Sequence, residues 1–217
     1  MTDNPSASNP AEPPLAEPNS LRKSLRQARR ALSPRQQQLA SRQLFHSLSK
    51  LLPFRRARRI AFYLPIDGEV DPRPLLTQAL QSGKKCYLPV IDPVNARRLR
   101  FVHICANTRL YLKQWGIAEP RPTAHRLCPA WALDLVLVPL TGFDAQGNRL
   151  GMGKGFYDRS FQFRQAGTDR ANGRRKRPLL IGVAHECQRV ARLHPSPWDI
   201  GMDLIVSDAR VYYPRDT

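Results

Sequence analysis

The chain has 217 residues, of which 41% are hydrophobic, and it carries four cysteines and a formal net charge of +18 at pH 7. This length and composition suffice for a sizeable buried core, and they exclude a collagen-like, fully disordered or disulfide-framework protein. The charge suits a polyanionic partner: a nucleic acid, an anionic lipid, or a small phosphorylated or polycarboxylated ligand.

The N-terminal 19 residues are rich in proline, alanine, asparagine and glutamate, so we expect a disordered tail over residues 1–19 and a single α/β domain over residues 20–217. Leucines and alanines at helical spacing predict a helix from Ser20 to about Leu32. Ser33 and Pro34 then begin a second helix that continues through Leu48.

Short apolar runs follow these two basic helices, separated by helix and turn signals. Helices are expected between Pro72 and Gly83 and over residues 156–164. Buried strands that alternate with helices predict one central, mostly parallel sheet flanked by helices. The expected strands are residues 59–64, 85–90, 99–104, 133–138, 179–184 and 204–206. The polar, basic stretch 164–178 predicts an exposed insertion loop.

The cysteine positions and the absence of long apolar runs indicate the compartment. Four separated cysteines without a CxxC pair suit a reducing cytosol and small buried side chains better than disulfides or a zinc site. They are Cys86, Cys105, Cys128 and Cys187. No apolar run approaches the roughly 20 residues that span a bilayer, and the N-terminus lacks the features of a signal peptide. We expect a soluble, cytoplasmic protein without a membrane partner.

The segment from Thr141 to Asp158 leaves the most apolar predicted strand and leads into a helix, at the sheet edge where α/β proteins bind ligands. Its glycines let backbone N–H groups approach a phosphate, and its basic side chains add positive charge. These residues are Arg149, Gly151, Gly153, Lys154 and Gly155. The spacing is neither a Walker A loop nor a dinucleotide fingerprint. The segment therefore predicts an anion-binding loop, with a plain surface turn as the alternative.

Asp158 follows this loop directly. A carboxylate one turn into the helix can hold Mg²⁺ against loop-bound phosphates, because Mg²⁺ prefers one or two carboxylates together with phosphate oxygens and water. The equally simple alternative is an acid that the helix dipole stabilises.

Residues 147–158, GNRLGMGKGFYD, resemble the signature GxRLGxGxGYYD of the 5-formyltetrahydrofolate cyclo-ligases, also called 5,10-methenyltetrahydrofolate synthetases. Supporting segments occur in the same order, so the resemblance covers about Ser20 to Val206. They lie at residues 20–22, 64–69, 115–120, 133–136 and 198–203. The resemblance implies an architecture related to phosphosugar isomerases and CoA-transferases. It also implies closure of 5-formyltetrahydrofolate to 5,10-methenyltetrahydrofolate, dependent on ATP and Mg²⁺ and releasing ADP and phosphate.

The same resemblance implies roles for individual residues, with Lys154 and Arg149 as the catalytic pair that neutralises the transferred phosphoryl group. The implied ATP contacts are Arg22, Arg149, Leu150, Gly151, Met152, Gly153, Lys154, Gly155, Phe156 and Tyr157. The implied substrate contacts are Leu64, Glu69, Trp115, Met152, Gly153, Lys154, Gly155 and Phe156. The implied Mg²⁺ ligands are Asp158 and Asp199.

Glu69 and Trp115 have structural alternatives. A carboxylate at Glu69 suits a pterin because it accepts two parallel hydrogen bonds, although a turn acid is the simpler role. Trp115 suits stacking on the substrate, although a buried core tryptophan is as common. The chain departs from the family at Pro18, where a lysine is frequent, and at Phe156, where the signature has tyrosine.

Two other functions compete with the cyclo-ligase. The basic helices and the loop at residues 164–178 suit nucleic acid, but no RNP, KH or helix-turn-helix pattern accompanies them. A phosphosugar isomerase or CoA-transferase relative shares the expected fold but needs no ATP. His185 to Arg189 begins like HExxH and lacks its second histidine. We therefore expect a monomer whose partners are a reduced folate and ATP, without a specific nucleic acid.

Overall fold

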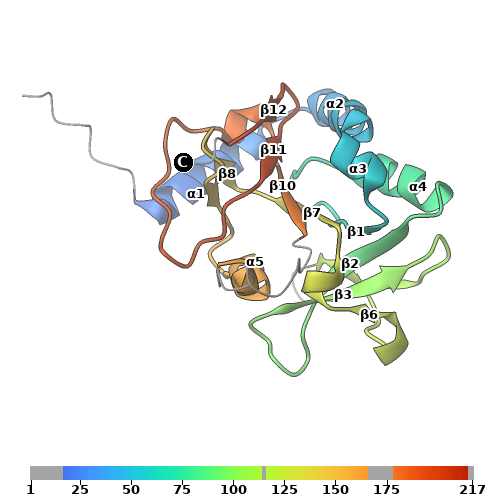
Figure 1. Ribbon diagram of the computed structural model, residues 1–217. Helices are drawn as coiled ribbons and strands as arrows, with labels where there is room; N and C mark the ends of the chain where they lie inside the picture. The colour runs from blue at the N-terminus through green and yellow to red at the C-terminus, as the bar shows by residue number, and fades with distance from the viewer. Residues whose placement is uncertain (1–16, 114–115, 166–177, 215–217) are drawn as a thin grey trace, which may run out of the picture.

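The computed structural model describes residues 17–113, 116–165 and 178–214. Most of the predicted tail, most of the predicted basic loop and Trp115 lie outside these residues. Helices precede and flank a central sheet (Figure 1). They are α1 (Pro18–Arg30), α2 (Pro34–Lys50), α3 (Leu52–Arg56), α4 (Arg73–Gln81) and α5 (Phe156–Phe161), with short 3₁₀ turns η2 (Ala124–Arg126), η3 (Ala130–Ala132), η4 (Gln162–Arg164) and η5 (Glu186–Gln188).

Eight strands form the central sheet in the order β12-β11-β10-β7-β1-β2-β3-β6. The neighbouring pairs from β11 to β2 are parallel, and β12, β3 and β6 add antiparallel edges. The strands are β1 (Arg59–Ala61), β2 (Lys85–Ile91), β3 (Leu99–Ile104), β6 (Leu127–Cys128), β7 (Leu135–Pro139), β10 (Leu179–Val183), β11 (Leu204–Val206) and β12 (Val211–Tyr212). Two small ribbons pair β4 (Leu110–Leu112) with β5 (Ala118–Pro120) and β8 (Gly142–Phe143) with β9 (Arg149–Leu150).

The sheet has an apolar core on each face. Successive side chains of a strand point to opposite faces, so Leu135 and Leu137 pack under α2, α3 and α4, whereas Val136 and Val138 pack with Phe161 of α5. This double burial explains why the central strands read as unbroken apolar runs. It also fixes α5, and the loop before it, against the second face.

The structure confirms the predicted α/β sheet and its long strands, and it corrects several boundaries. Strand β1 ends at Ala61 and β7 begins at Leu135, and the flanking Phe62, Tyr63 and Leu133 are buried outside the strands. Helix α1 begins at Pro18, two residues before the predicted start, since proline suits the first turn of a helix. Within the described residues, no helix is long and apolar enough to cross a membrane.

The prediction that all four cysteines are buried side chains is correct for two of them. Cys86 and Cys128 are buried, as expected for small apolar side chains, but Cys105 and Cys187 are exposed. The prediction of a core position is therefore wrong for Cys105, in the turn after β3, and for Cys187 in η5. Both lie in connections, where a cysteine has no second apolar layer above it.

Candidate active site at the glycine loop

A short hairpin carries the glycine loop away from the end of β7. The buried side chain of Asp144 closes the hairpin turn: Oδ1 accepts hydrogen bonds from the backbone N–H groups of Gln146 and Asn148, both at 3.0 Å. Its Oδ2 accepts another from the Leu193 N–H at 2.8 Å. Gly147 adopts φ 86°, and a Cβ there would lie 2.5 Å from Pro214 Cγ, so the turn requires glycine. The hairpin delivers Arg149 to the base of the loop.

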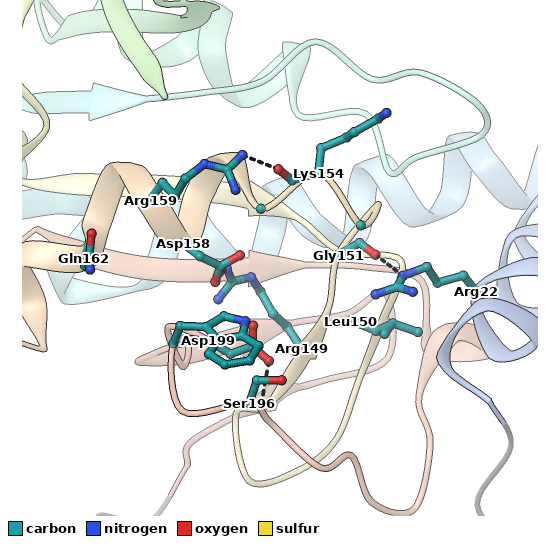
Figure 2. A pocket seen from close by; sticks show the side chains of 13 residues that line it. Arg22, Arg149, Leu150, Gly151, Lys154, Asp158, Arg159, Gln162, Ser196 and Asp199 are labelled. Atoms are coloured by element: carbon teal, nitrogen blue, oxygen red, sulfur yellow. Dashed lines mark hydrogen bonds and ion pairs between the residues drawn. The ribbon is translucent and has the colours of Figure 1, made fainter. Parts of the chain in front are cut away.

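Two arginines from different elements hold the loop at its two ends (Figure 2). Arg22 of α1 donates from Nε to the Gly151 carbonyl oxygen at 2.9 Å. Arg159 of α5 donates to the Lys154 carbonyl oxygen and, from Nε, to the Arg97 carbonyl oxygen at 2.6 Å. The loop backbone is therefore tied to both α1 and the β2–β3 connection.

The loop borders a cavity of about 450 Å³. The lining residues are Arg22, Arg149, Leu150, Gly151, Gly153, Lys154, Gly155, Asp158, Arg159, Gln162, Ser196, Trp198 and Asp199. Four cationic side chains face two carboxylates in this lining, so the cavity suits an anion. Most of the predicted phosphate and metal residues meet here.

Arg149 and Asp158 form a buried ion pair inside this cavity. The Arg149 side chain is 6% exposed, and its Nη2 donates to Asp158 Oδ1. Its Nη1 is buried and has no hydrogen-bond partner among the described residues. A buried guanidinium nitrogen without an acceptor is costly, and an anionic ligand oxygen would satisfy it.

The predicted metal ligands are both at the cavity, and each is partly engaged. Asp158 Oδ1 also accepts from the Ile200 N–H at 3.1 Å, and Asp199 Oδ2 accepts from the Ser196 N–H at 2.8 Å. The other oxygen of each carboxylate lies outside these hydrogen bonds. No cluster of three or more metal-binding side chains occurs in the described parts of the chain. Two carboxylates fit Mg²⁺ only when phosphate oxygens and water complete its shell.

Lys154 is exposed, and Figure 2 shows its side chain directed away from Asp158 and Asp199. A lysine has a long flexible stem, so its ammonium group can turn toward a bound phosphate without moving the loop. Met152 is exposed and Phe156 half-buried, and neither lines the cavity.

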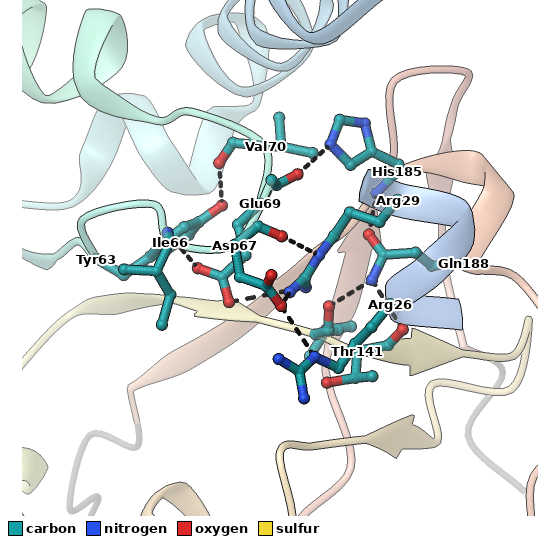
Figure 3. Close-up of polar contacts among 12 residues, drawn as sticks. Arg26, Arg29, Tyr63, Ile66, Asp67, Glu69, Val70, Thr141, His185 and Gln188 are labelled. Atoms are coloured by element: carbon teal, nitrogen blue, oxygen red, sulfur yellow. Dashed lines mark hydrogen bonds and ion pairs between the residues drawn. The ribbon is translucent and has the colours of Figure 1, made fainter. Parts of the chain in front are cut away.

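Leu64 and Glu69, the residues predicted to hold the pterin, do not line the cavity. Figure 3 shows Glu69 in its surroundings. Leu64 is half-buried against the core below α2 and α4. Glu69 lies in the turn after β1, and its side chain is 7% exposed. Its Oε2 accepts from the Ile66 N–H at 3.2 Å, and Arg29 Nη1 lies 3.8 Å from its Oε1. Burial raises the pKa of Glu69 to about 7, against the lowering effect of Arg29.

Tyr157 follows the glycine loop and senses the charge of Glu69, although it does not line the cavity. It is the first tyrosine after the loop, and its ring lies parallel to that of Phe161. Burial raises the pKa of Tyr157 above its ordinary value, and the charge of Glu69 raises it further. Glu69 therefore lies within electrostatic reach of the loop's end, although it does not line the cavity.

Sequence reasoning missed four cavity residues: Arg159, Gln162, Ser196 and Trp198. Arg159 directly follows the signature. A cation one residue beyond an anion-binding loop could have been predicted to contact the same anion. Trp198 is adjacent in sequence to the predicted metal ligand Asp199, and this position could also have indicated a site residue. Its side chain is 67% exposed. Gln162 and Ser196 have no such signal, because only the folded chain brings them to the loop.

Comparisons with known proteins agree with this geometry. The model of the 5-formyltetrahydrofolate cyclo-ligase family matches residues 15–208. The 5-formyltetrahydrofolate cyclo-ligase of Escherichia coli K12 is 36% identical over 188 residues, covering 87% of this chain and 98% of that protein. The Haemophilus influenzae cyclo-ligase is 34% identical over 187 residues, covering 86% and 95%.

Solved structures give the same result. The NMR structure of Aquifex aeolicus 5,10-methenyltetrahydrofolate synthetase superposes with a TM-score of 0.76 at 30% identity, covering 92% of this chain and 94% of that one. The Mycoplasma pneumoniae 5,10-methenyltetrahydrofolate synthetase gives 0.66 at 25% identity, covering 89% and 99%. These matches support neither the nucleic-acid-binding nor the isomerase alternative. The chain belongs to the 5-formyltetrahydrofolate cyclo-ligase family.

Proposed function

We propose that this chain closes 5-formyltetrahydrofolate to 5,10-methenyltetrahydrofolate in a reaction that consumes ATP and requires Mg²⁺. The observation that carries the proposal is the cationic cavity at the glycine loop, in a chain whose relatives are named for this reaction. Reduced folate and ATP are then its small-molecule partners. We keep the expectation that the chain acts as a monomer.

The chemistry requires activation of a poor leaving group. The formyl oxygen attacks the γ-phosphorus of ATP and releases ADP, and the neighbouring folate nitrogen then attacks the activated carbon. Phosphate and a proton leave as the new ring forms. Phosphoryl transfer asks mainly for positioning and charge neutralisation, so no side-chain nucleophile is required.

In this proposal Arg22, Arg149 and Lys154 neutralise the triphosphate. Arg149 contributes the buried Nη1 that lacks an acceptor, and Lys154 turns its exposed ammonium group toward the γ-phosphate. Such charges act strongly in a partly enclosed cavity, where they stabilise the transition state more than the ground state.

Asp158 and Asp199 hold Mg²⁺ in this proposal. Bound there, the ion would neutralise phosphate oxygens and hold the triphosphate in one orientation. Both carboxylates already receive backbone N–H groups, which fix their positions before a ligand arrives.

Glu69 orients the pterin in this proposal. An ionised carboxylate accepts two parallel hydrogen bonds from a ring N–H and the adjacent amino group. Because the charge of Glu69 reaches Tyr157 at the end of the loop, the folate would extend from the turn toward the loop residues proposed to contact it. Met152 and Phe156 do not line the cavity, and we assign them to the folate in this proposal.

The test is the absorbance of methenyltetrahydrofolate formed from 5-formyltetrahydrofolate, recorded with and without ATP and Mg²⁺. The proposal expects product only when both are present. Folded protein that forms no product in the complete mixture would refute it. Product formed without ATP would refute the phosphorylation step.

A further inference from the structure

Asp67 contacts three arginines of α1, two of which, Arg26 and Arg29, are shown in Figure 3. Arg26 Nε and Arg29 Nη2 contact its Oδ2 at 2.9 and 2.8 Å, and Arg30 Nε contacts its Oδ1. Burial alone would raise the pKa of Asp67, but the hydrogen bonds from Arg30, Arg26 and Arg29 lower it below its ordinary value. Two arginines remain on Asp67 when any one of the three is removed.

Arg29 differs from the other two because it is fully buried. Its Nε donates to the backbone carbonyl oxygen of Asp67 at 2.8 Å, in addition to the side-chain contact. Asp67 adopts φ 53°, an uncommon conformation for a residue with a side chain. His185 Nε2 lies 3.0 Å from the next carbonyl oxygen, that of Gly68. The backbone before Glu69 is therefore fixed from both sides.

The remaining nitrogen of Arg29 faces Glu69. Nη1 has no hydrogen-bond partner among the described residues, and it lies 3.8 Å from Glu69 Oε1. The other charged or titratable groups near this carboxylate are Arg26 of α1, Asp67 of the same turn, Tyr63 after β1 and Tyr157 of α5. Arg29 is thus the fully buried cation that faces Glu69. It hydrogen-bonds the backbone of the turn at Asp67 and lies beside the negative charge of Glu69.

We propose that Arg29 is a positioning residue that keeps the Glu69 carboxylate ionised and oriented for the pterin. The proposal rests on the function proposed above, in which Glu69 binds the substrate. With Arg29 in place the pKa of Glu69 is already raised to about 7. Without this cation the buried carboxylate would take up a proton at still higher pH and lose one of its two acceptor oxygens. Arg29 contacts no substrate in this account and acts only through Glu69 and its turn.

The experiment compares Arg29→Met with Arg30→Met. Both changes remove one positive charge from the same helix. Arg29→Met removes two hydrogen bonds to Asp67 and Arg30→Met removes one, but only Arg29 faces Glu69. For Arg29→Met we expect a KM for 5-formyltetrahydrofolate about tenfold higher and a KM for ATP within about twofold of wild type. Arg30→Met should match wild type in both.

The pH profile separates positioning from simple loss of structure. The value of kcat/KM for the folate should fall as pH drops through the pKa of Glu69, because the protonated carboxyl accepts poorly. Removing Arg29 raises that pKa, so the acidic limb should move to higher pH by about one unit. Arg29→Lys restores a cation without the paired donors of the guanidinium group. The acidic limb of its pH profile should therefore return toward that of wild type.

Each outcome is decisive. An unshifted acidic limb in Arg29→Met, or equal effects of Arg29→Met and Arg30→Met, would overturn the positioning role while the proposed function stands. If Arg29→Met does not fold, Arg29→Lys carries the test, and an unshifted limb with unchanged folate KM overturns the role. Wild-type protein that forms no methenyl product with ATP and Mg²⁺ would instead refute the proposed function itself.

Discussion

The glycine loop and the turn at residues 66–69 both place carboxylates beside arginines, but in different surroundings. At the loop, Lys154 is exposed and the cavity is open to a ligand. At the turn, Arg29 is fully buried and the Glu69 side chain is 7% exposed. The Lys154 charge at the loop is therefore separable from the stability of the fold, whereas the charges of Arg29 and Glu69 at the turn link ligand binding, protonation and stability.

Glu69→Gln should give the largest loss. The amide offers one oxygen to the pterin and repels its donors with the other group, and hydrogen bonds to a charged group are worth about 1.5–3 kcal/mol each. We expect kcat/KM for 5-formyltetrahydrofolate to fall about 10²- to 10³-fold, with KM for ATP within about twofold. Steady-state kinetics with each substrate varied in turn measures both. An equal weakening of the kinetic constants for ATP and for 5-formyltetrahydrofolate would show that the turn does not act separately from the loop.

Lys154→Ala tests the other side of the comparison. In our proposal the Lys154 ammonium group stabilises the negative charge that develops on the transferred phosphoryl group in the transition state. Its removal should therefore lower kcat about 10²-fold. Because the side chain is exposed, the unfolding temperature should change by no more than about 1–2 °C. Lys50→Ala, an exposed lysine on α2 outside the cavity, is the matched control and should leave both quantities unchanged. Wild-type turnover in Lys154→Ala would exclude its catalytic role.

Stability should respond to pH through Glu69. Its pKa is about 7 in the folded protein, above the ordinary value of about 4.3. The folded state therefore binds the proton more tightly, and Glu69 lowers the free energy of unfolding as pH rises from about 4.5 to 7, by about 4 kcal/mol at most. Glu69→Gln removes this effect.

Thermal unfolding at pH 5 and pH 8 checks this sign. Glu69→Gln should unfold at a higher temperature than wild type at pH 8, by several degrees, while the difference at pH 5 should be small. A variant less stable than wild type at pH 8 would show that the Arg29 contact outweighs the burial of the charge.

Gly155→Ala should have the smallest of these effects. Gly155 adopts φ 61°, and a Cβ there would lie 2.7 Å from Arg159 Nη1. Left-handed backbone and the displaced guanidinium should together lower the free energy of unfolding by about 1–2 kcal/mol. Gly151→Ala is the matched control, since Gly151 has no positive φ and open space at its Cβ. Equal stability of the two variants, measured by denaturant unfolding, would contradict the strain argument.

Sequence reasoning found the elements that repeat a pattern over many residues. Strands β2, β3, β10 and β11 and helices α1, α2 and α4 are long or apolar enough to show their periodicity or burial. The ribbons β4–β5 and β8–β9 and the edge strands β6 and β12 have two or three residues per strand. Such segments are too short to alternate, and tertiary contacts alone make them strands.

The site divides in the same way. A contiguous signature carries the loop residues, so Arg149, Lys154 and Asp158 could be predicted from sequence and do meet at one cavity. Arg29 and Asp67 are separated by 38 positions in the sequence, so no local pattern can reveal their contact. On sequence Arg29 was one basic residue among many on an exposed helix, and only burial in the fold distinguishes it from Arg26 and Arg30.

Equilibrium binding of each ligand alone tests the central claim most directly. Calorimetric titration of wild type, Lys154→Ala and Glu69→Gln with ATP in the presence of Mg²⁺, and separately with 5-formyltetrahydrofolate, measures the two affinities independently. The account predicts that Glu69→Gln loses at least tenfold in folate affinity and keeps its ATP affinity, and that Lys154→Ala weakens ATP binding more than folate binding. Wild-type folate affinity in Glu69→Gln would contradict a pterin subsite at the turn.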